Sequence, residues 1–557
     1  MPLGSSITNI LRFSLLAAIV AITNVGSIDR LFLLVEQGRY GTIAFTLAIW
    51  MFALIAMVIV AVEPRWKVRL FWAVLFGFAG AVAFGYQRAS GTEMTVFDGL
   101  SLWSARHQAT EAQAVYTQVI AISFVLFGFT VGLFCIPAKL VKNWQRGWGV
   151  LCSITPVIPV ALIAAIIFLK QGGGSLGLPK QFTELSIAGL VGAKVLLEPV
   201  VPRSEVEWQP FSQQATKKIV MLVDESLRPD YLDPANITGE TPEFARLAPK
   251  FINFGPAASS GICSSYSNAM LRYGASRAEL GSSINVVPTL WQYAKKAGYR
   301  TVFIDAQARN ISSAGRLQNF MTIDETKSID KIYRIDVGAS EADEALLDVL
   351  SEELKSGQRV FIYANKQGVH FPYDHDYPAS AARYHPTITE AGANTLQSNN
   401  ASYKNAVLWN VDRFFGRMFK ETDLTNTTLV YTSDHGQSLD PKSLTHCATE
   451  NALPEMALVP LYVYTDDKAQ REKLQRGAEK SRDHATHFQI AASVLNWMGY
   501  ADSDLASRYN ESLTLGTSHE PAFTTGDVFG LFSTQPKWNP IDLSANYREI
   551  SSLALQN

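Results

Sequence analysis

The sequence has little excess charge of either sign. Lysine and arginine number 48 against 50 aspartate and glutamate residues, which leaves a net charge of -2 with neutral histidines. No stretch of the chain concentrates basic residues. A nucleic acid is therefore not expected as the main partner.

Cysteine is also scarce. The chain has four cysteines and no Cys-x-x-Cys pair, which excludes the usual zinc-binding and redox patterns of that kind. Cys135 and Cys152 lie within apolar runs, so only Cys263 and Cys447 belong to the more polar part of the chain. Their separation neither requires nor forbids a disulfide, and the cysteines say little about the cellular compartment.

Long apolar runs fill the first 170 residues, whereas the remainder has the composition of a soluble protein. A chain of 557 residues is too long for one ordinary domain, so at least two units are expected. A helix crosses a bilayer in about 20 residues. We predict an N-terminal bundle of five transmembrane helices, near residues 11–33, 43–63, 70–87, 115–137 and 148–170. Asp29 and Arg30 make the first of these spans the weakest, and without a small-residue cleavage site it is expected to be a retained anchor.

The distribution of basic residues in the short loops predicts the orientation of the bundle. Loops 64–69 and 138–147 each carry three lysines or arginines, which places both loops and the N-terminus in the cytoplasm. With five spans, everything after Lys170 lies outside. The predicted location is therefore a bacterial cytoplasmic membrane, with the second domain in the periplasm or on the outer surface.

A linker is expected between the two domains. We divide the chain into a transmembrane domain at 1–170, a linker at 171–215 and an extracytoplasmic domain at 216–557. The linker begins with the flexible segment Gly172-Gly173-Gly174-Ser175. Its moderately apolar part at 183–199 fits either a helix on the membrane surface or a plain connector.

Short β-branched runs alternate with helical patterns after Lys217. Strands are predicted at 218–223, 300–304, 359–364, 428–432 and 458–464, with helices at 288–298 and 399–419. This alternation predicts an α/β domain with a mainly parallel sheet sandwiched by helices. Functional groups in such sheets gather beyond the C-terminal ends of the strands.

Three of the predicted strands end in chemically active residues. Asp224-Glu225-Ser226, Asn365 to His370, and Ser433-Asp434-His435-Gly436 each follow a strand. A single histidine is more often structural than functional, but adjacent carboxylate and imidazole groups after a strand suit Zn²⁺. Asp305 also follows a strand, and it fits either a pocket lining or a helix cap.

The segment Ser433 to Leu439 resembles the Ser-Asp-His-Gly-Glu-Ser-Leu element of the lipid A phosphoethanolamine transferases. These are five-span membrane enzymes of the alkaline phosphatase and sulfatase superfamily, related to the lipoteichoic acid synthases. Other segments that resemble the family occur in the same order along the chain. They are Glu225, Gly261 to Ser267, Gly368 to Pro372, Tyr403 to Ala406 with Asp412, and Asp483-His484.

The resemblance implies a zinc site and a covalent nucleophile. Its four zinc ligands would be Glu225, Ser264, Asp434 and His435. Ser264 takes the place of the family's nucleophilic threonine, and Ser265 is kept as an alternative. The histidines that the resemblance offers for binding phosphate or moving protons are His370, His446 and His484. One Zn²⁺ is expected at the nucleophile, and a second is an open question.

The implied reaction is transfer of phosphoethanolamine from phosphatidylethanolamine, through phospho-Ser264, to an envelope glycolipid or polysaccharide. Direct contact with Zn²⁺ would lower the pKa of the serine hydroxyl and make it a nucleophile. Phosphoglycerol transfer from phosphatidylglycerol, a lipid phosphodiesterase and a non-catalytic envelope regulator are the alternatives. The chain departs from the family in Ser264, in Asp224 where the family has glycine, and in its few cysteines, which leaves the acceptor open. The oligomeric state is not indicated.

Sulfate-ester hydrolysis is a further alternative that depends on Cys263. Sulfatases convert a Cys or Ser followed by x-Pro-x-Arg into formylglycine. Here Cys263 is followed by Ser264-Ser265-Tyr266-Ser267, without that proline or arginine. We therefore interpret Cys263 as a small buried residue beside the site.

Overall fold

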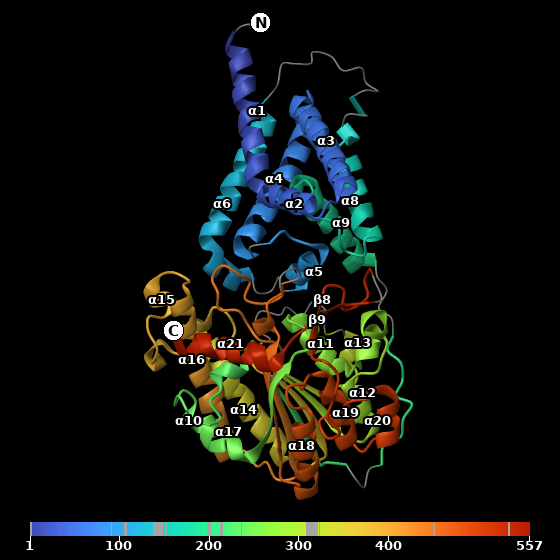
Figure 1. The fold of residues 1–557 in the computed structure, drawn as a ribbon, viewed down its shortest axis with the longest axis vertical. Helices are drawn as coiled ribbons and strands as arrows, with labels where there is room; N and C mark the ends of the chain where they lie inside the picture. The colour runs from blue at the N-terminus through green and yellow to red at the C-terminus, as the bar shows by residue number, and fades with distance from the viewer. Residues whose placement is uncertain are drawn as a thin grey trace. The chain divides into compact units, whose positions relative to one another are not determined.

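The computed structural model describes residues 3–90, 92–104, 109–136, 149–150, 153–197, 202–211, 215–235, 237–307, 321, 323–448, 452–532 and 535–556. The chain divides into two compact units, Met1–Pro199 and Val200–Asn557. Figure 1 shows the first as a set of helices and the second as a sheet covered by helices.

Helices make up the first unit. They are α1 (Leu3–Thr23), α2 (Val25–Glu36), α3 (Tyr40–Val62), α4 (Trp66–Ser90), α5 (Val96–Ser104), α6 (Ala109–Cys135), α8 (Val157–Leu169) and α9 (Lys180–Leu197). Within the described part of the chain, three helical segments are long and apolar enough to cross a membrane: Tyr40–Val62, Trp66–Ser90 and Tyr116–Cys135. These correspond to three of the five predicted spans.

The first predicted span is a bent pair of helices. Asn9–Thr23 and Val25–Glu36 meet at 73°. Asn24 lies at the break, where its Nδ2 donates to the carbonyl of Val20 at 2.8 Å and its Oδ1 accepts from the backbone N–H of Lys180 at 2.7 Å. A side chain that binds nearby backbone groups competes with helical hydrogen bonds, which accounts for the bend.

The fifth predicted span is shorter than expected. Helix α8 has 13 residues, fewer than the roughly 20 needed to cross a bilayer. It begins after Pro156, which occupies its N-cap, and residues 151–152 of the predicted span lie outside the described residues. The expectation of five spans is therefore not confirmed: three helices qualify among the described residues, or four if the bent pair forms one span.

Helix α9 lies in the segment that we expected to be a linker. Phe182 and Thr183 on this helix are fully buried. The Nζ of Lys180 pairs with Glu93 Oε2 at 2.9 Å, and both side chains are buried. This helix is thus an integral part of the first unit.

The second unit is built on a mixed seven-stranded sheet in the order β2-β7-β6-β1-β5-β3-β4. The strands are β1 (Lys218–Asp224), β2 (Phe251–Ala258), β3 (Arg300–Asp305), β4 (Lys331–Arg334), β5 (Val360–Asn365), β6 (Thr427–Ser433) and β7 (Leu458–Thr465). Strands β1, β3, β4, β5 and β6 pair in parallel, and β7 runs antiparallel to both of its neighbours, β6 and β2. All five predicted strands are present, while β2, β4 and the direction of β7 were not predicted.

Helices cover both faces of the sheet, as predicted (Figure 1). On β1, Ile219, Met221 and Val223 face a core formed with α12 (Leu290–Lys296), α18 (Lys468–Lys480), α19 (Phe488–Trp497) and α20 (Asp502–Arg508). Val220 and Leu222 face the opposite core, formed with α10 (Pro242–Leu247), α14 (Ala339–Lys355), α16 (Leu396–Val407) and α17 (Arg413–Glu421).

The predicted helix at 399–419 is longer than expected and contains a change of pitch. Helices α16 and α17 are joined by a π-helical segment, η9 (Leu408–Asp412). Such segments are rare and are frequent near functional sites. The other elements are η3 (Pro229–Tyr231), η4 (Ala248–Lys250), α11 (Ser264–Tyr273), η5 (Arg277–Glu279), η6 (Gly281–Asn285), α13 (Ile323–Thr326), η7 (Tyr373–His375), η8 (Ala379–Ala381), α15 (Ile388–Ala391), η10 (Pro454–Met456), β8 (Ala522–Thr525), β9 (Lys537–Pro540) and α21 (Leu543–Gln556).

Candidate active site

Glu225, Asp434 and His435 meet at the C-terminal ends of two neighbouring strands. Glu225 directly follows β1, and Asp434 and His435 directly follow β6, with Asp224 in register with Ser433. The three side chains are fully buried. Each offers one ligand atom, and these atoms lie within 4.8 Å of one another. The parallel pairing of β1 and β6 therefore creates the cluster that the sequence suggested.

Ser264 brings a hydroxyl to the same cluster. It is the first residue of α11, directly after the N-cap Cys263. Its Oγ donates to Oε1 of Glu225 at 2.9 Å and lies 3.0 Å from Nε2 of His435. The hydroxyl of Ser265 instead lies 3.6 Å from the sulfur of Cys263. Of the two candidate serines, the structure places Ser264 at the cluster.

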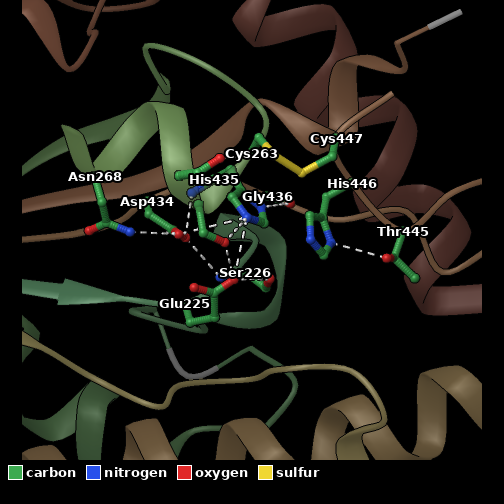
Figure 2. Close-up of a disulfide and its surroundings, with 12 residues drawn as sticks. Glu225, Ser226, Cys263, Asn268, Asp434, His435, Gly436, Thr445, His446 and Cys447 are labelled. Atoms are coloured by element: carbon green, nitrogen blue, oxygen red, sulfur yellow. Dashed lines mark hydrogen bonds and ion pairs between the residues drawn. A yellow bond between two sulfur atoms is a disulfide. The ribbon is translucent and has the colours of Figure 1, made fainter. Parts of the chain in front are cut away.

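Hydrogen bonds orient the carboxylate of Asp434. Its Oδ1 accepts the backbone N–H groups of Ser226 at 3.1 Å and of His435 at 2.7 Å. Its Oδ2 accepts from Nδ2 of Asn268 at 3.1 Å (Figure 2). The amide oxygen of Asn268 accepts in turn from the hydroxyl of Tyr363 at 2.7 Å, which sets the orientation of the amide.

The imidazole of His435 is oriented by a hydrogen bond at Nδ1, the ring nitrogen that faces away from Ser264. Nδ1 lies 2.6 Å from the carbonyl oxygen of Gly436, so Nδ1 carries a proton and donates it. In the neutral ring this leaves the lone pair on Nε2, which lies 3.3 Å from Glu225 Oε1. A backbone carbonyl on the far nitrogen is a common way of orienting a metal-binding histidine.

Burial and mutual interaction shift the pKa values in the cluster. Burial, together with the charge of Glu225, raises the pKa of Asp434 well above its usual range. Burial opposes the charged forms of His435 and Glu225 as well. However, the Asp434 and Glu225 carboxylates raise the pKa of His435 to about 9, and interactions with His435 and His370 lower that of Glu225 well below its usual range.

These residues fit a divalent cation. When ionised, the carboxylates of Glu225 and Asp434 carry two negative charges, which a divalent cation balances, so the buried site accepts it without an unpaired charge. Carboxylate oxygen with imidazole nitrogen is a donor set typical of Zn²⁺.

His446 and His370 lie beside the cluster. The ring of His446 stacks on that of His435, with centroids 4.6 Å apart and planes 25° apart (Figure 2). Burial, followed by the charge of His435, lowers the pKa of His446 to about 3 and makes it a neutral ring. His370 is half-buried, and its charge influences both Glu225 and His446. A backbone hydrogen bond connects the segment that carries His370 to the site: the N–H of Val369 donates to the carbonyl of Glu225 at 3.1 Å.

His484 is not brought into the cluster by any contact of the described residues. Its Nδ1 is buried without a hydrogen-bond partner among them. His487, which we did not predict, forms hydrogen bonds to two segments that carry residues of the cluster. Its Nδ1 accepts the backbone N–H of Ser260 at 3.2 Å, and its Nε2 lies 3.0 Å from the hydroxyl of Thr432. His487 thereby ties the segment before α11 to the strand before Asp434.

Gln307 is a second residue that the sequence did not indicate. Its Nε2 donates to Oε2 of Glu225 at 2.9 Å and to the carbonyl of Lys366 at 2.7 Å. Asp305, two residues earlier, stays at its strand end, where it accepts from the N–H of Gln307 and from Asn365. Asp305 was expected either to line the pocket or to cap a helix. The structure favours a local structural role at the end of β3. Tyr403 also supports the site, because its hydroxyl donates to the Ser226 carbonyl at 2.7 Å.

A disulfide joins Cys263 to Cys447 across 184 residues of sequence. Cys263 directly precedes Ser264 in the chain, and Cys447 directly follows His446, beside which the disulfide lies in Figure 2. The N–H of Cys447 also donates to the Ile262 carbonyl at 2.7 Å. A bonded cysteine offers no thiol for conversion to formylglycine, which agrees with the absence of the proline and arginine of that pattern.

The sequence profile of the family described as "Sulfatase" matches residues 217–500. This chain belongs to the sulfatase family. The matched region covers the sheet and every residue of the cluster, so the sulfatase-family domain contains the candidate site.

Two relatives add detail. The chain is 31% identical over 188 residues to the Kdo(2)-lipid A phosphoethanolamine 7''-transferase of Salmonella typhimurium, a match that covers 30% of this chain and 33% of that protein. The match thus spans about a third of the length of that relative. The lipooligosaccharide phosphoethanolamine transferase A of Neisseria meningitidis, an integral membrane protein, has a similar structure, with a TM-score of 0.63 at 15% identity. That similarity covers 90% of this chain and 98% of the other, and it shows a shared fold of membrane helices followed by a sulfatase-family domain.

Proposed function

We propose that this protein transfers phosphoethanolamine from phosphatidylethanolamine to an envelope glycolipid or polysaccharide, through a phosphoester on Ser264. The observation that carries the proposal is the position of the Ser264 hydroxyl between Glu225 and His435. The names of the two relatives, both phosphoethanolamine transferases that act on lipid A or lipooligosaccharide, support the choice of reaction.

Glu225, Asp434, His435 and Ser264 are the residues that would bind one Zn²⁺. When bound, the metal would lower the pKa of the serine hydroxyl and neutralise charge on a phosphoryl group. Three of these residues are already oriented by a hydrogen bond to a group outside the set: Glu225 by Gln307, Asp434 by Asn268, and His435 by the carbonyl of Gly436.

Ser264 lies where a phosphoryl group is stabilised by the fold itself. It begins the ten-residue helix α11, whose N-terminal backbone N–H groups and dipole favour negative charge. Attack by Oγ forms the Oγ–phosphorus bond and breaks the bond from phosphorus to the diacylglycerol oxygen. In the structure the Oγ–H donates to Glu225 Oε1, and this proton would be released when the hydroxyl binds the metal. In the second half of the reaction, an acceptor hydroxyl displaces Ser264.

His370 and His446 are proposed to bind the phosphoryl oxygens. His446 is a buried neutral ring stacked on His435, so it is suited to donate one hydrogen bond without adding charge. His370 is half-buried and therefore suited to exchange protons with solvent, including the proton that leaves with diacylglycerol. The role that we assigned to His484 is less well supported than the roles of these two residues.

The location follows from the same proposal. We place the protein in a bacterial inner membrane with a cytoplasmic N-terminus and a periplasmic catalytic domain. The Cys263–Cys447 disulfide supports this orientation, since disulfides persist in oxidising compartments and are rare in the cytosol. Phosphoglycerol transfer, lipid hydrolysis and a non-catalytic role remain the alternatives that the experiment has to separate.

The test is incubation of the purified full-length protein with vesicles of phosphatidylethanolamine or of phosphatidylglycerol. Intact mass and released diacylglycerol are measured in parallel. We expect one phosphoethanolamine adduct per chain, absent after chelation and in Ser264→Ala and retained in the neighbouring control Ser265→Ala. A phosphoglycerol adduct would identify phosphatidylglycerol as the donor in place of phosphatidylethanolamine. Continued release of free phosphoethanolamine without an acceptor would indicate a hydrolase. No adduct with either lipid in a zinc-loaded protein would contradict the proposal.

A further inference from the structure

A basic groove lies on the second unit and contains none of the candidate site residues. It encloses about 1160 Å³ and is lined by residues of α10, η4, η8, η9, α16 and α17 and by the two residues after η8. Its lining includes six basic and three acidic side chains, in a protein with a net charge of -2. The basic residues are Arg246, Lys250, Arg383, Arg413, Arg417 and Lys420. Positive charge is therefore concentrated at this groove.

Part of this positive charge is not neutralised. Arg246 pairs with Glu243, and Arg417 pairs with Glu344, Asp348 and Glu421. By contrast, Lys250, Arg383 and Lys420 form no ion pair with any described residue, and all three are exposed. Arg413 approaches a carboxylate, that of Glu344, only at 3.7 Å. Four cations of the groove are thus available to an anionic ligand.

Two of these cations are fixed by aromatic rings. The guanidinium of Arg413 lies 3.8 Å from the centre of the Trp409 ring, and the Trp409 indole N–H donates to the Ser340 carbonyl at 2.7 Å. The Nζ of Lys250 lies 5.0 Å from the centre of the Phe419 ring. Stacking orders these side chains, while Lys250 forms no ion pair with a described residue and Arg413 meets only the carboxylate of Glu344, at 3.7 Å. A planar guanidinium held in this way is suited to bind a phosphate or carboxylate through two parallel hydrogen bonds.

We propose that this groove is a binding site for an anionic glycan, whose phosphate or carboxylate groups contact Arg383, Arg413, Lys250 and Lys420. Its volume exceeds that of a typical small-molecule pocket, roughly 300–1,000 Å³, which favours several sugar units over a single phosphate ion. Lys250 ends η4, Arg383 follows η8, and Arg413 and Lys420 lie near opposite ends of α17, so the cations are spread along the groove and match charges repeated along a chain. The site would bind a charged polymer away from the catalytic cluster.

This inference is independent of the transfer chemistry, and binding is therefore measured on full-length Ser264→Ala, which cannot form the serine phosphoester. The probes are a phosphorylated mannopentaose, an oligogalacturonate of similar length, unmodified mannopentaose, inorganic phosphate and a short poly-glutamate peptide. Titrations are done at about 0.15 M ionic strength, where exposed charges more than about 8 Å apart are screened. The phosphorylated and carboxylated glycans show which anionic group is preferred.

The variants are Arg413→Gln and Arg383→Gln, compared with Arg476→Gln. Arg476 is exposed on α18, which covers the opposite face of the sheet, so it is a matched loss of one positive charge. We expect at least one charged glycan to bind, with Kd raised about tenfold in Arg413→Gln and in Arg383→Gln and unchanged in Arg476→Gln. Unmodified mannopentaose and inorganic phosphate should bind at least tenfold more weakly than that glycan.

Three results would overturn the proposal. The first is that neither charged glycan binds to a folded protein. The second is an equal loss of affinity in all three variants, which would indicate non-specific attraction. The third is a poly-glutamate affinity equal to that of the glycans with the same dependence on Arg413, which would indicate an acidic protein partner. Because Arg383 makes no side-chain hydrogen bond to a described residue, its variant distinguishes lost binding from misfolding even if Arg413→Gln disturbs Trp409.

Discussion

The Nζ of Lys366 lies 2.8 Å from Oδ2 of Asp224, and both side chains are fully buried. The same ammonium donates to the Asn410 carbonyl at 2.7 Å and lies 3.4 Å from Oδ2 of Asp343. Asp224 precedes Glu225, and Lys366 begins the segment that ends in His370. This buried cation therefore connects the ends of β1 and β5 to the π-helical segment η9.

Replacement of Lys366 by methionine should strongly destabilise the second unit. It leaves Asp224 and Asp343 buried without a counter-charge, a situation that costs about 3–5 kcal/mol in comparable cases. Urea unfolding of the full chain in detergent measures the loss. Lys355→Met is the matched control, because Lys355 is exposed and its single ion pair with a described residue is to Glu352 at 3.5 Å. A Lys366→Met variant as stable as this control would show that the pair contributes little.

Zinc content should depend on the three buried ligands. We expect Asp434→Asn and His435→Ala to lose nearly all bound zinc, because each removes a donor atom from the cluster. Asn268→Ala keeps all ligands but loses the hydrogen bond to Asp434, and it should bind zinc about 10–100-fold more weakly. Metal analysis after dialysis against graded chelator measures both effects. Stoichiometric zinc in Asp434→Asn would contradict the proposed ligand set.

His487 should affect the rate of adduct formation more than zinc affinity. Among the described residues its side chain has hydrogen bonds with Ser260, Thr432 and Ser267, none of which is a proposed metal ligand. We expect His487→Ala to slow formation of the serine adduct about tenfold or more while zinc affinity stays near that of the wild type. His487→Gln, which keeps one acceptor and one donor, should recover part of the rate. An unchanged rate in His487→Ala would show that the contact has no positioning role.

The disulfide should contribute to stability through its long loop. A bond across 184 residues restricts the unfolded chain, and such bonds typically contribute about 2–4 kcal/mol, with a range up to 5. The double variant Cys263→Ser/Cys447→Ser should therefore unfold at lower urea concentration, and a reducing agent should lower wild-type stability to the same value. Cys135→Ser is the control because Cys135 is not bonded. Equal stability of the double variant and the control would contradict this expectation.

The sheet was predicted where strands are continuous apolar runs and was missed where they are interrupted. The run at 218–223 is fully buried and corresponds to β1. Strand β2 contains Gly255-Pro256 and an irregular register between Asn253 and Pro256, and these residues are typical of turns. Strand β4 has only four residues, two of them exposed. Whether β7 runs parallel or antiparallel to β6 depends on the path that the chain takes between these two strands. The hydrophobic pattern of the sequence does not indicate that path.

The cluster of Glu225, Asp434 and His435 was predictable because each residue directly follows a strand. The residues that orient this cluster through hydrogen bonds were not predictable, because they come close to it only in the folded chain. His487 and Ser267 lie 220 positions apart, and Gln307 lies 82 positions from Glu225. No local pattern separates His487 from His484, three residues earlier. In the first unit, Asn24 lies at the bend between two helices and contacts α9. A search for apolar runs in the sequence cannot detect such contacts.

The most direct measurement is to locate the lipid-derived group within the protein. The wild-type protein is incubated with phosphatidylethanolamine, quenched in acid, digested, and sequenced by tandem mass spectrometry across residues 251–277. The proposal predicts phosphoethanolamine on Ser264, dependent on zinc and removed when an acceptor is added. Modification of Ser265, or of any residue outside the cluster, would contradict the assignment of Ser264 as the nucleophile.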